Sequence, residues 1–180
     1  MKQKVSDYIA DRLAQEGISQ VFTVTGGGAM HLNDSLGHHP GLSCLYHHHE
    51  QAAAMAAEAY ARVDNRMAAV CVTSGPGATN AITGALCAWM DSIPMLVLSG
   101  QVRYDTTVRH SGLKIRTMGV QEYDITPSVE PMTKYAVMVT DPLTIRYHLE
   151  RAIYLAKTGR PGPCWLCLLY RSDAADDMQC

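Results

Sequence analysis

The sequence predicts an α/β domain in which an open, mostly parallel sheet lies between two layers of helices. Short, nearly continuous apolar runs alternate with segments of helical periodicity, a pattern typical of parallel strands that are covered on both faces. Glycine-rich turns follow two of these runs. Right-handed crossovers place the carboxyl ends of such strands along one edge of the sheet, where open α/β sheets bind their ligands. We therefore expect the functional site at that edge.

Bulk composition bounds the classes of function. The chain has 180 residues, of which 47% are hydrophobic and 18% charged, enough for one domain with a real core. A net charge of -2 gives no basic surface for nucleic acid. The most apolar region, 81–98, is broken by Asp91 and Pro94 and is too short to cross a membrane. The amino terminus lacks the apolar segment of a signal peptide, so we expect a cytoplasmic protein without membrane or nucleic-acid partners.

The cysteines indicate reduced thiols. Several of them lie inside apolar runs, which favours buried free thiols over a disulfide framework. Cys164 and Cys167 form a C-x-x-C pair, but no second pair completes a zinc site and no helix pattern follows as in a redox motif. The six are Cys44, Cys71, Cys87, Cys164, Cys167 and Cys180.

Apolar spacing assigns the elements in order. Val5, Ile9 and Leu13 recur at helical spacing, and Gly17 ends that helix. Asp141 is an expected N-cap, with Pro142 in the first helical position and Gly159 after the end. The polar segment 101–126 is long for a connection, which favours a functional or interface loop. Helices are expected over 4–16, 30–36, 50–63, from about 76 to 89, and 142–157, and strands over 21–24, 42–46, 67–73, 94–100, 135–139 and 163–168.

Two glycine-rich strand-to-helix turns, 25–28 and 74–80, are candidate ligand loops. Glycine lets the backbone approach a ligand closely, and a helix amino terminus presents free N–H groups. A dinucleotide fingerprint is one reading, but His31 and Asn80 stand where its third glycine is required. The consecutive histidines 47–49 cannot all face one ion in an extended segment. No metal ligand is assigned.

Glu50 begins an alanine-rich helix directly after a short strand. One reading is a carboxylate that complements the helix dipole. The other is a functional acid at the ligand-binding edge of the sheet. Residue types and spacing alone leave both readings open.

Several motifs occur in a fixed order: VFTVTGG at 21–27, HEQAA at 49–53, VTSGPGATN at 72–80, MDSIPM at 90–95, QEYDI at 121–125 and TGRPGP at 158–163. Together they resemble the N-terminal pyrimidine-binding domain of thiamine-diphosphate enzymes, and within that family the large subunit of acetolactate synthase. The resemblance extends over about residues 4 to 166, and its collinear motifs make it specific. It implies the three-layer fold expected above.

The resemblance also implies roles for individual residues. Glu50 matches the glutamate that hydrogen-bonds N1′ of the cofactor's aminopyrimidine ring and helps to remove the proton from the thiazolium carbon. Gln121 matches a glutamine near the substrate pocket, and these two are the candidate catalytic residues. The candidate cofactor-binding residues are Thr25, Gly26, Gly27, Glu50, Thr73, Pro76, Gly77 and Asn80.

By the same resemblance, the expected activity is decarboxylation of a 2-oxo acid such as pyruvate, followed by carboligation. Thiamine diphosphate is the expected cofactor, and FAD binding is left open. The diphosphate and Mg²⁺ would be held by a diphosphate-binding domain that this chain lacks, supplied by a partner chain in a homodimer or larger assembly. The chain alone is expected to be inactive.

Departures from the family pattern leave the acceptor substrate open. Thr25 stands where proline is usual, Gly28 where alanine is usual, and Val120 where phenylalanine is usual. The pattern also ends abruptly, so we expect a pyrimidine-binding domain at 1–166 and a divergent, non-native tail at 167–180. Two alternatives are a separate pyrimidine-domain subunit of a split 2-oxo-acid decarboxylase, and a non-catalytic binding or assembly module.

Overall fold

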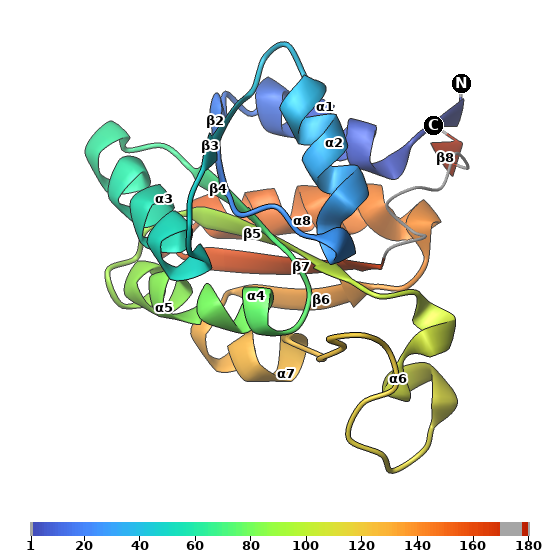
Figure 1. The fold of residues 1–180 in the computed structure, drawn as a ribbon. Coiled ribbons are helices and arrows are strands. Elements are labelled where there is room, and N and C mark those ends of the chain that lie inside the picture. Colours follow the sequence, from blue (N-terminus) through green and yellow to red (C-terminus); the bar gives the residue numbers. More distant parts are fainter. Residues whose placement is uncertain (1, 170–177, 180) are drawn as a thin grey trace.

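A computed structural model describes residues 2–169 and 178–179. Its centre is a six-stranded sheet with the order β3-β2-β4-β5-β7-β6, in which every neighbouring pair is parallel (Figure 1). The predicted α/β fold is confirmed. The strands are β2 (Gln20–Thr23), β3 (Ser43–Tyr46), β4 (Ala68–Val72), β5 (Met95–Gln101), β6 (Tyr135–Val139) and β7 (Pro163–Leu169).

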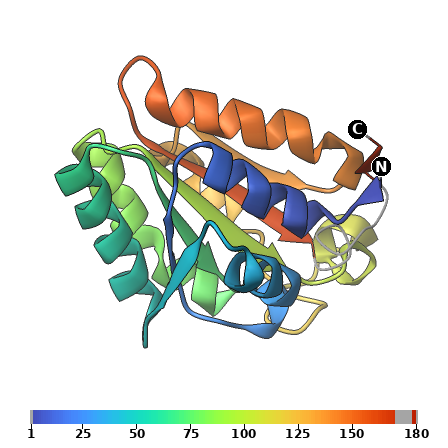
Figure 2. The same ribbon diagram turned by 90° about the horizontal axis from the view of Figure 1, so that it is seen from above.

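Helices α1 (Val5–Gln15), α2 (Met30–His38) and α8 (Ile145–Lys157) cover one face of the sheet (Figures 1 and 2). Ile9, Leu32 and Leu149 are fully buried there against Leu96 and Leu166 of the sheet. The helical spacing of such residues predicts an apolar stripe, and the stripe is what holds each helix on the sheet.

The opposite face is covered by α3 (Glu50–Asp64), α4 (Pro76–Asn80), α5 (Ile82–Met90) and α7 (Thr126–Val129). Alanines of α3 and α5 form much of this second core, together with Val70 and Trp165. Trp165 is completely buried, and its Nε1 donates a 2.8 Å hydrogen bond to Ser99 Oγ. Small side chains let α3 and α5 lie close to the sheet and to each other.

Several local features differ from the sequence expectation, the short helices α6 (Val108–Ser111) and α7 among them. The helix expected from 76 to 89 is divided at Ala81 into α4 and α5. The last long helix begins with the 3₁₀ turn η4 (Pro142–Thr144), although Asp141 is the N-cap expected there and accepts from Leu143 N at 3.0 Å. A small antiparallel pair, β1 (Lys2–Gln3) with β8 (Met178–Gln179), was not expected.

Strand β7 is the last strand of the large sheet in sequence, yet it lies between β5 and β6. Its pairing with β5 runs from Pro163 to Leu169, and all seven of its residues are buried. The strand therefore continues past residue 166, where the domain was expected to end. The non-native origin of the tail stays a prediction, and most of that tail lies outside the described residues.

Close contact between α3 and α5 depends on Gly84. A Cβ added there would lie 2.5 Å from Ala54 Cβ and 2.6 Å from the Ala54 carbonyl carbon. Backbone atoms cannot give way cheaply, so we expect Gly84→Ala to lower the free energy of unfolding by about 1–3 kcal/mol, measured by urea denaturation. The control is Gly37→Ala on the exposed surface of α2, where the nearest atom is the hydroxyl at the end of the exposed Tyr46 side chain, 3.3 Å away; it should raise stability by up to about 1 kcal/mol. A stabilising Gly84→Ala would contradict the packing argument.

Candidate functional site

The candidate site lies at the carboxyl ends of three adjacent strands. Strand β2 pairs with β3 on one side and with β4 on the other. After β3 the chain therefore crosses to the opposite side of β2 to form β4. Such a switch point opens a crevice between the loops that leave neighbouring strands. The loops after β2, β3 and β4 carry most of the residues that the sequence singled out.

Glu50 is the first residue of α3 and follows β3 closely. His47 N donates to Thr23 O at 2.8 Å, so the chain stays paired with β2 for one residue beyond β3. His49 is the N-cap, and its Nδ1 accepts from Gln51 N at 3.1 Å. This cap fixes the direction in which α3 starts, and Glu50 is consequently held half-buried over the ends of the strands.

The two carboxylate oxygens of Glu50 have different surroundings. Asn80, at the end of α4, donates from Nδ2 to Glu50 Oε2 at 2.9 Å. A Cβ on Gly77 would lie 3.2 Å from Glu50 Oε1 and 2.5 Å from Thr73 Cγ2. Gly77 therefore packs tightly against Thr73 and Glu50. Within the described residues Oε1 has no hydrogen-bond partner, whereas Oε2 is held in place by an amide.

Thr73 joins the loop after β4 to the loop after β2. Its Oγ1 accepts from Gly28 N at 3.1 Å. A Cβ on Gly26 would lie 2.5 Å from Thr73 Cβ, so the first glycine turn must pass directly over this threonine. The glycines at 26 and 77 are thus required by close approach on both sides of Thr73.

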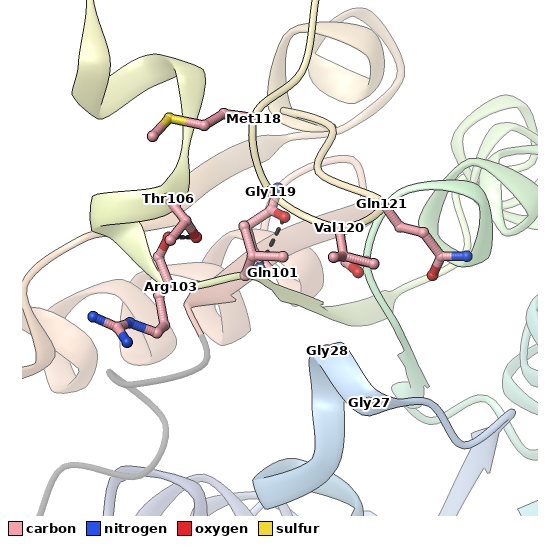
Figure 3. Close-up of a pocket in the computed structure, with 11 residues that line it drawn as sticks. Gly27, Gly28, Gln101, Arg103, Thr106, Met118, Gly119, Val120 and Gln121 are labelled. Atoms are coloured by element: carbon pink, nitrogen blue, oxygen red, sulfur yellow. Dashed lines mark hydrogen bonds between the residues drawn. The ribbon is translucent and has the colours of Figure 1, made fainter.

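A cavity of about 550 Å³ continues from this cluster along the end of β5 (Figure 3). Gly27, Gly28 and Ser74 line it on the strand side, and the long loop after β5 lines the other. Gln121 is part of that loop and has a left-handed φ of 56°. Its carbonyl oxygen would be only 2.2 Å from a Cβ at residue 75, where glycine itself has φ 54°.

Glu122 holds the loop that lines this cavity. Its Oε1 accepts from Val108 N at 2.7 Å, and its Oε2 accepts from Met118 N at 2.9 Å and from Gly119 N at 3.3 Å. One carboxylate therefore connects the short helix α6 (Val108–Ser111) to the segment before Gln121. Charge-assisted bonds of this kind give order to an otherwise irregular segment.

The structure brings five of the predicted residues into one cluster and leaves the others near it. Gly27 and Gln121 line the neighbouring cavity, while Thr25 and Pro76 are exposed. Sequence reasoning assigned no role to Ser74 or to Arg103, which also line the cavity. The position of Ser74 inside a glycine-rich turn could have indicated that it lines a ligand site. No local sequence pattern indicates this for Arg103. The clustered residues are Gly26, Glu50, Thr73, Gly77 and Asn80.

The C-x-x-C pair has a structural position. Cys164 and Cys167 both belong to the buried strand β7. Burial raises the pKa of each thiol to about 12, so both are neutral near pH 7 and lack the thiolate that redox or metal chemistry needs. Within residues 2–169 and 178–179, no three His, Cys, Asp or Glu side chains gather as a metal site.

This geometry defines a class of protein. A parallel α/β domain carries a half-buried glutamate at its switch point, beside two glycine turns that pack around Thr73. The family model described as "Thiamine pyrophosphate enzyme, N-terminal TPP binding domain" matches residues 3–123. The chain belongs to this thiamine pyrophosphate enzyme family, and the resemblance noted in the sequence is confirmed.

Curated relatives include large subunits of acetolactate synthase. The chain is 38% identical to the acetolactate synthase large subunit of Haemophilus influenzae and 37% identical to that of Lactococcus lactis, in each case over 158 residues. It is 39% identical over 158 residues to the acetolactate synthase isozyme 3 large subunit of Escherichia coli. Each match covers 88% of this chain and 26% of the relative, so the chain spans about a quarter of their length.

Proposed function

We propose that this chain supplies the pyrimidine-binding part of a thiamine-diphosphate-dependent 2-oxo-acid carboligase or decarboxylase similar to acetolactate synthase. The observation that carries the proposal is the asymmetric environment of Glu50. Asn80 donates to one carboxylate oxygen, and the other has no hydrogen-bond partner within the described residues. A helix-dipole role alone does not require an amide partner on one of the two oxygens.

The residues present fit the cofactor's pyrimidine end. Side chains at 26 and 77 would collide with Thr73, so both glycines let the two turns pack against this threonine beside Glu50. When bound, thiamine diphosphate supplies a carbon nucleophile and an electron sink for decarboxylation. Glu50 Oε1 would hold a proton shared with a ring nitrogen, which is the requirement for general acid–base assistance at that position.

Asn80 acts on Glu50 rather than on the reacting atoms. Its bond to Oε2 restricts rotation of the carboxyl group and leaves Oε1 available. Thr73 keeps the first glycine turn in position through Gly28 N. Gln121 and Gly27 line the adjoining cavity, and we assign that cavity to the 2-oxo acid and the acceptor.

The rest of the proposed site comes from outside this chain. We propose that Mg²⁺ and the diphosphate are held by a diphosphate-binding domain of a partner chain, and that FAD is an optional further cofactor. Exposed apolar side chains on α3 and α5, which belong to Met55, Leu86, Trp89 and Met90, support a dimer or a domain interface on this face. The free thiols of the described cysteines support a cytoplasmic location. No described helix has the length and apolarity needed to cross a membrane.

A chimera tests the proposal. Residues 3–166 of this chain replace the matching segment in the acetolactate synthase isozyme 3 large subunit of Escherichia coli, and acetolactate and CO₂ are measured from pyruvate with thiamine diphosphate and Mg²⁺. We expect turnover by the chimera and none by the 180-residue chain alone. Size-exclusion chromatography first establishes that the chimera is soluble and assembled. A well-assembled chimera without turnover would overturn the proposed function, and turnover by the chain alone would overturn its dependence on a partner.

A further inference from the structure

The cavity beside the Glu50 cluster is larger than a three-carbon substrate needs. Its volume of about 550 Å³ is in the range of sites for much larger small molecules. Its described lining is mostly apolar or glycine, and Arg103 is the one charged residue in it. Figure 3 shows Arg103 and Gln121 at opposite ends, with Val120 between them.

At the end near Glu50, Ser74 is buried without a partner. It is only 4% exposed, and within the described chain no residue forms a hydrogen bond with its hydroxyl. A Cβ on Gly28 would lie 2.7 Å from Ser74 Oγ, so the hydroxyl faces the glycine turn that lines the same cavity. A buried hydroxyl without a partner is unfavourable, and a polar group of a ligand would satisfy it.

Gln121 adds a second polar group at this end. It is exposed, its side chain has no hydrogen bond within the described residues, and its left-handed φ of 56° is unusual for a residue other than glycine. Strained backbone of this kind persists where the surroundings impose it, and it is frequent at ligand sites. Together, Ser74 and Gln121 offer a donor and an amide to a carbonyl or hydroxyl group.

At the other end, Arg103 retains donors for an anion. Asp105 pairs with Nε, at 3.0 Å, and with Nη2, which leaves Nη1 without a hydrogen bond inside the described residues. A guanidinium can bind two carboxylates through different edges because it has five N–H donors in fixed directions. Val102, Met118 and Val120 are the apolar side chains of the lining, and Val120 lies between the two ends (Figure 3).

We propose that this cavity selects an elongated acceptor: a carbonyl compound whose reactive end meets Ser74 and Gln121, whose body is apolar, and whose distal anionic group binds Arg103. This assignment rests on the proposed function, which places the carboligation chemistry beside Glu50. It makes Ser74 and Arg103 specificity-determining residues for the acceptor.

Three probes test the inference on the 180-residue chain by isothermal titration calorimetry: 4-carboxybenzaldehyde, benzaldehyde and pyruvate. The two aldehydes share a reactive carbonyl and an apolar ring, so their difference isolates the distal carboxylate. We expect 4-carboxybenzaldehyde to bind about tenfold more tightly than benzaldehyde, as one charge-assisted hydrogen bond provides, and more tightly than pyruvate. Equal affinity of the two aldehydes, or tightest binding of pyruvate, would overturn the inference.

Variants locate the two ends. Arg103→Gln should abolish the roughly tenfold preference, while Arg146→Gln, an exposed cation on α8, should keep it. Ser74→Ala should weaken the binding of both aldehydes by the same factor. It should leave the midpoint of urea denaturation unchanged or higher, because it removes an unpaired buried hydroxyl. A Ser74→Ala variant that loses stability and keeps its affinity would assign this hydroxyl to folding alone and overturn its role in binding.

The experiments distinguish failure of the acceptor inference from failure of the proposed function. Glu50→Gln should leave the affinities of all three probes unchanged, because Glu50 does not line the cavity. An active chimera without a preference for the distal carboxylate overturns only the acceptor inference. A preference found together with an inactive, assembled chimera overturns the proposed function and, with it, the assignment of the bound compound as an acceptor.

Discussion

Glu50→Gln is expected to lower pyruvate turnover by the chimera about 100- to 10,000-fold, the range over which positioned acids and bases act. Glutamine keeps the size of the side chain and an oxygen for Asn80, but it cannot hold a proton shared with a ring nitrogen. In the 180-residue chain, the same change should lower the free energy of unfolding by no more than about 1 kcal/mol, which is the usual worth of a charge at a helix amino terminus.

Glu58→Gln on the same helix is the matched control. Glu58 is buried and forms an ion pair with Arg62, with Arg62 Nε 3.1 Å from its Oε1. It lies outside the cluster around Thr73, so its loss should reduce stability while turnover by the folded chimera is kept. If Glu50→Gln loses stability as Glu58→Gln does and keeps turnover, the helix-dipole reading of Glu50 is correct.

Gly100→Ala is expected to lower the free energy of unfolding by about 3 kcal/mol or more, at the upper end for overpacking a buried position. A Cβ at residue 100 would lie 2.0 Å from Gly28 O and 2.7 Å from Ala29 N. The contact is between β5 and the backbone of the first glycine turn, so no side-chain rotation relieves it. The turn must move away from Thr73, and the bond from Gly28 N to Thr73 Oγ1 should be lost with it.

Urea denaturation measures the loss, and Gly162→Ala serves as its control. Gly162 is also buried, but the nearest atoms to an added Cβ are methylenes of Lys134 at 3.2 Å, and this flexible side chain can shift. We expect Gly162→Ala to cost less than about 1.5 kcal/mol. Equal stability of the two variants would show that the glycine turn accommodates a side chain at residue 100.

The fold was predictable because its strands are buried on both faces. Runs such as 67–73 and 94–100 are apolar except for Thr73 and Ser99, and parallel strands covered by helices favour that composition. The break at Ala81 was not predictable, since no glycine or proline stands at 78–83 to mark it. Strand order was equally hidden, because no local pattern shows that β7 enters between β5 and β6.

The candidate site was predictable where it depends on strand ends. Glu50 and the two glycine turns follow adjacent parallel strands, so topology alone brings them together. The hydrogen-bond partner of Glu50 could not be predicted from the sequence. Asn80 lies 30 positions further along the chain, and the bond connects the end of α4 to the start of α3. Gln121 was identified by its motif, but its place beside Gly75 depends on the path of a long, irregular loop.

The central position of β7 has a consequence for synthesis of the protein on the ribosome. The six-stranded sheet cannot assemble strand by strand as the chain is synthesised. Strand β6 has no neighbour to pair with until residues 163–169, which form β7, have been made. Until then, the edge of β5 that later pairs with β7 is open to solvent or to another nascent chain. Such late, long-range closure slows folding, so this domain is expected to depend on chaperones more than an α/β domain whose last strand is added at the edge.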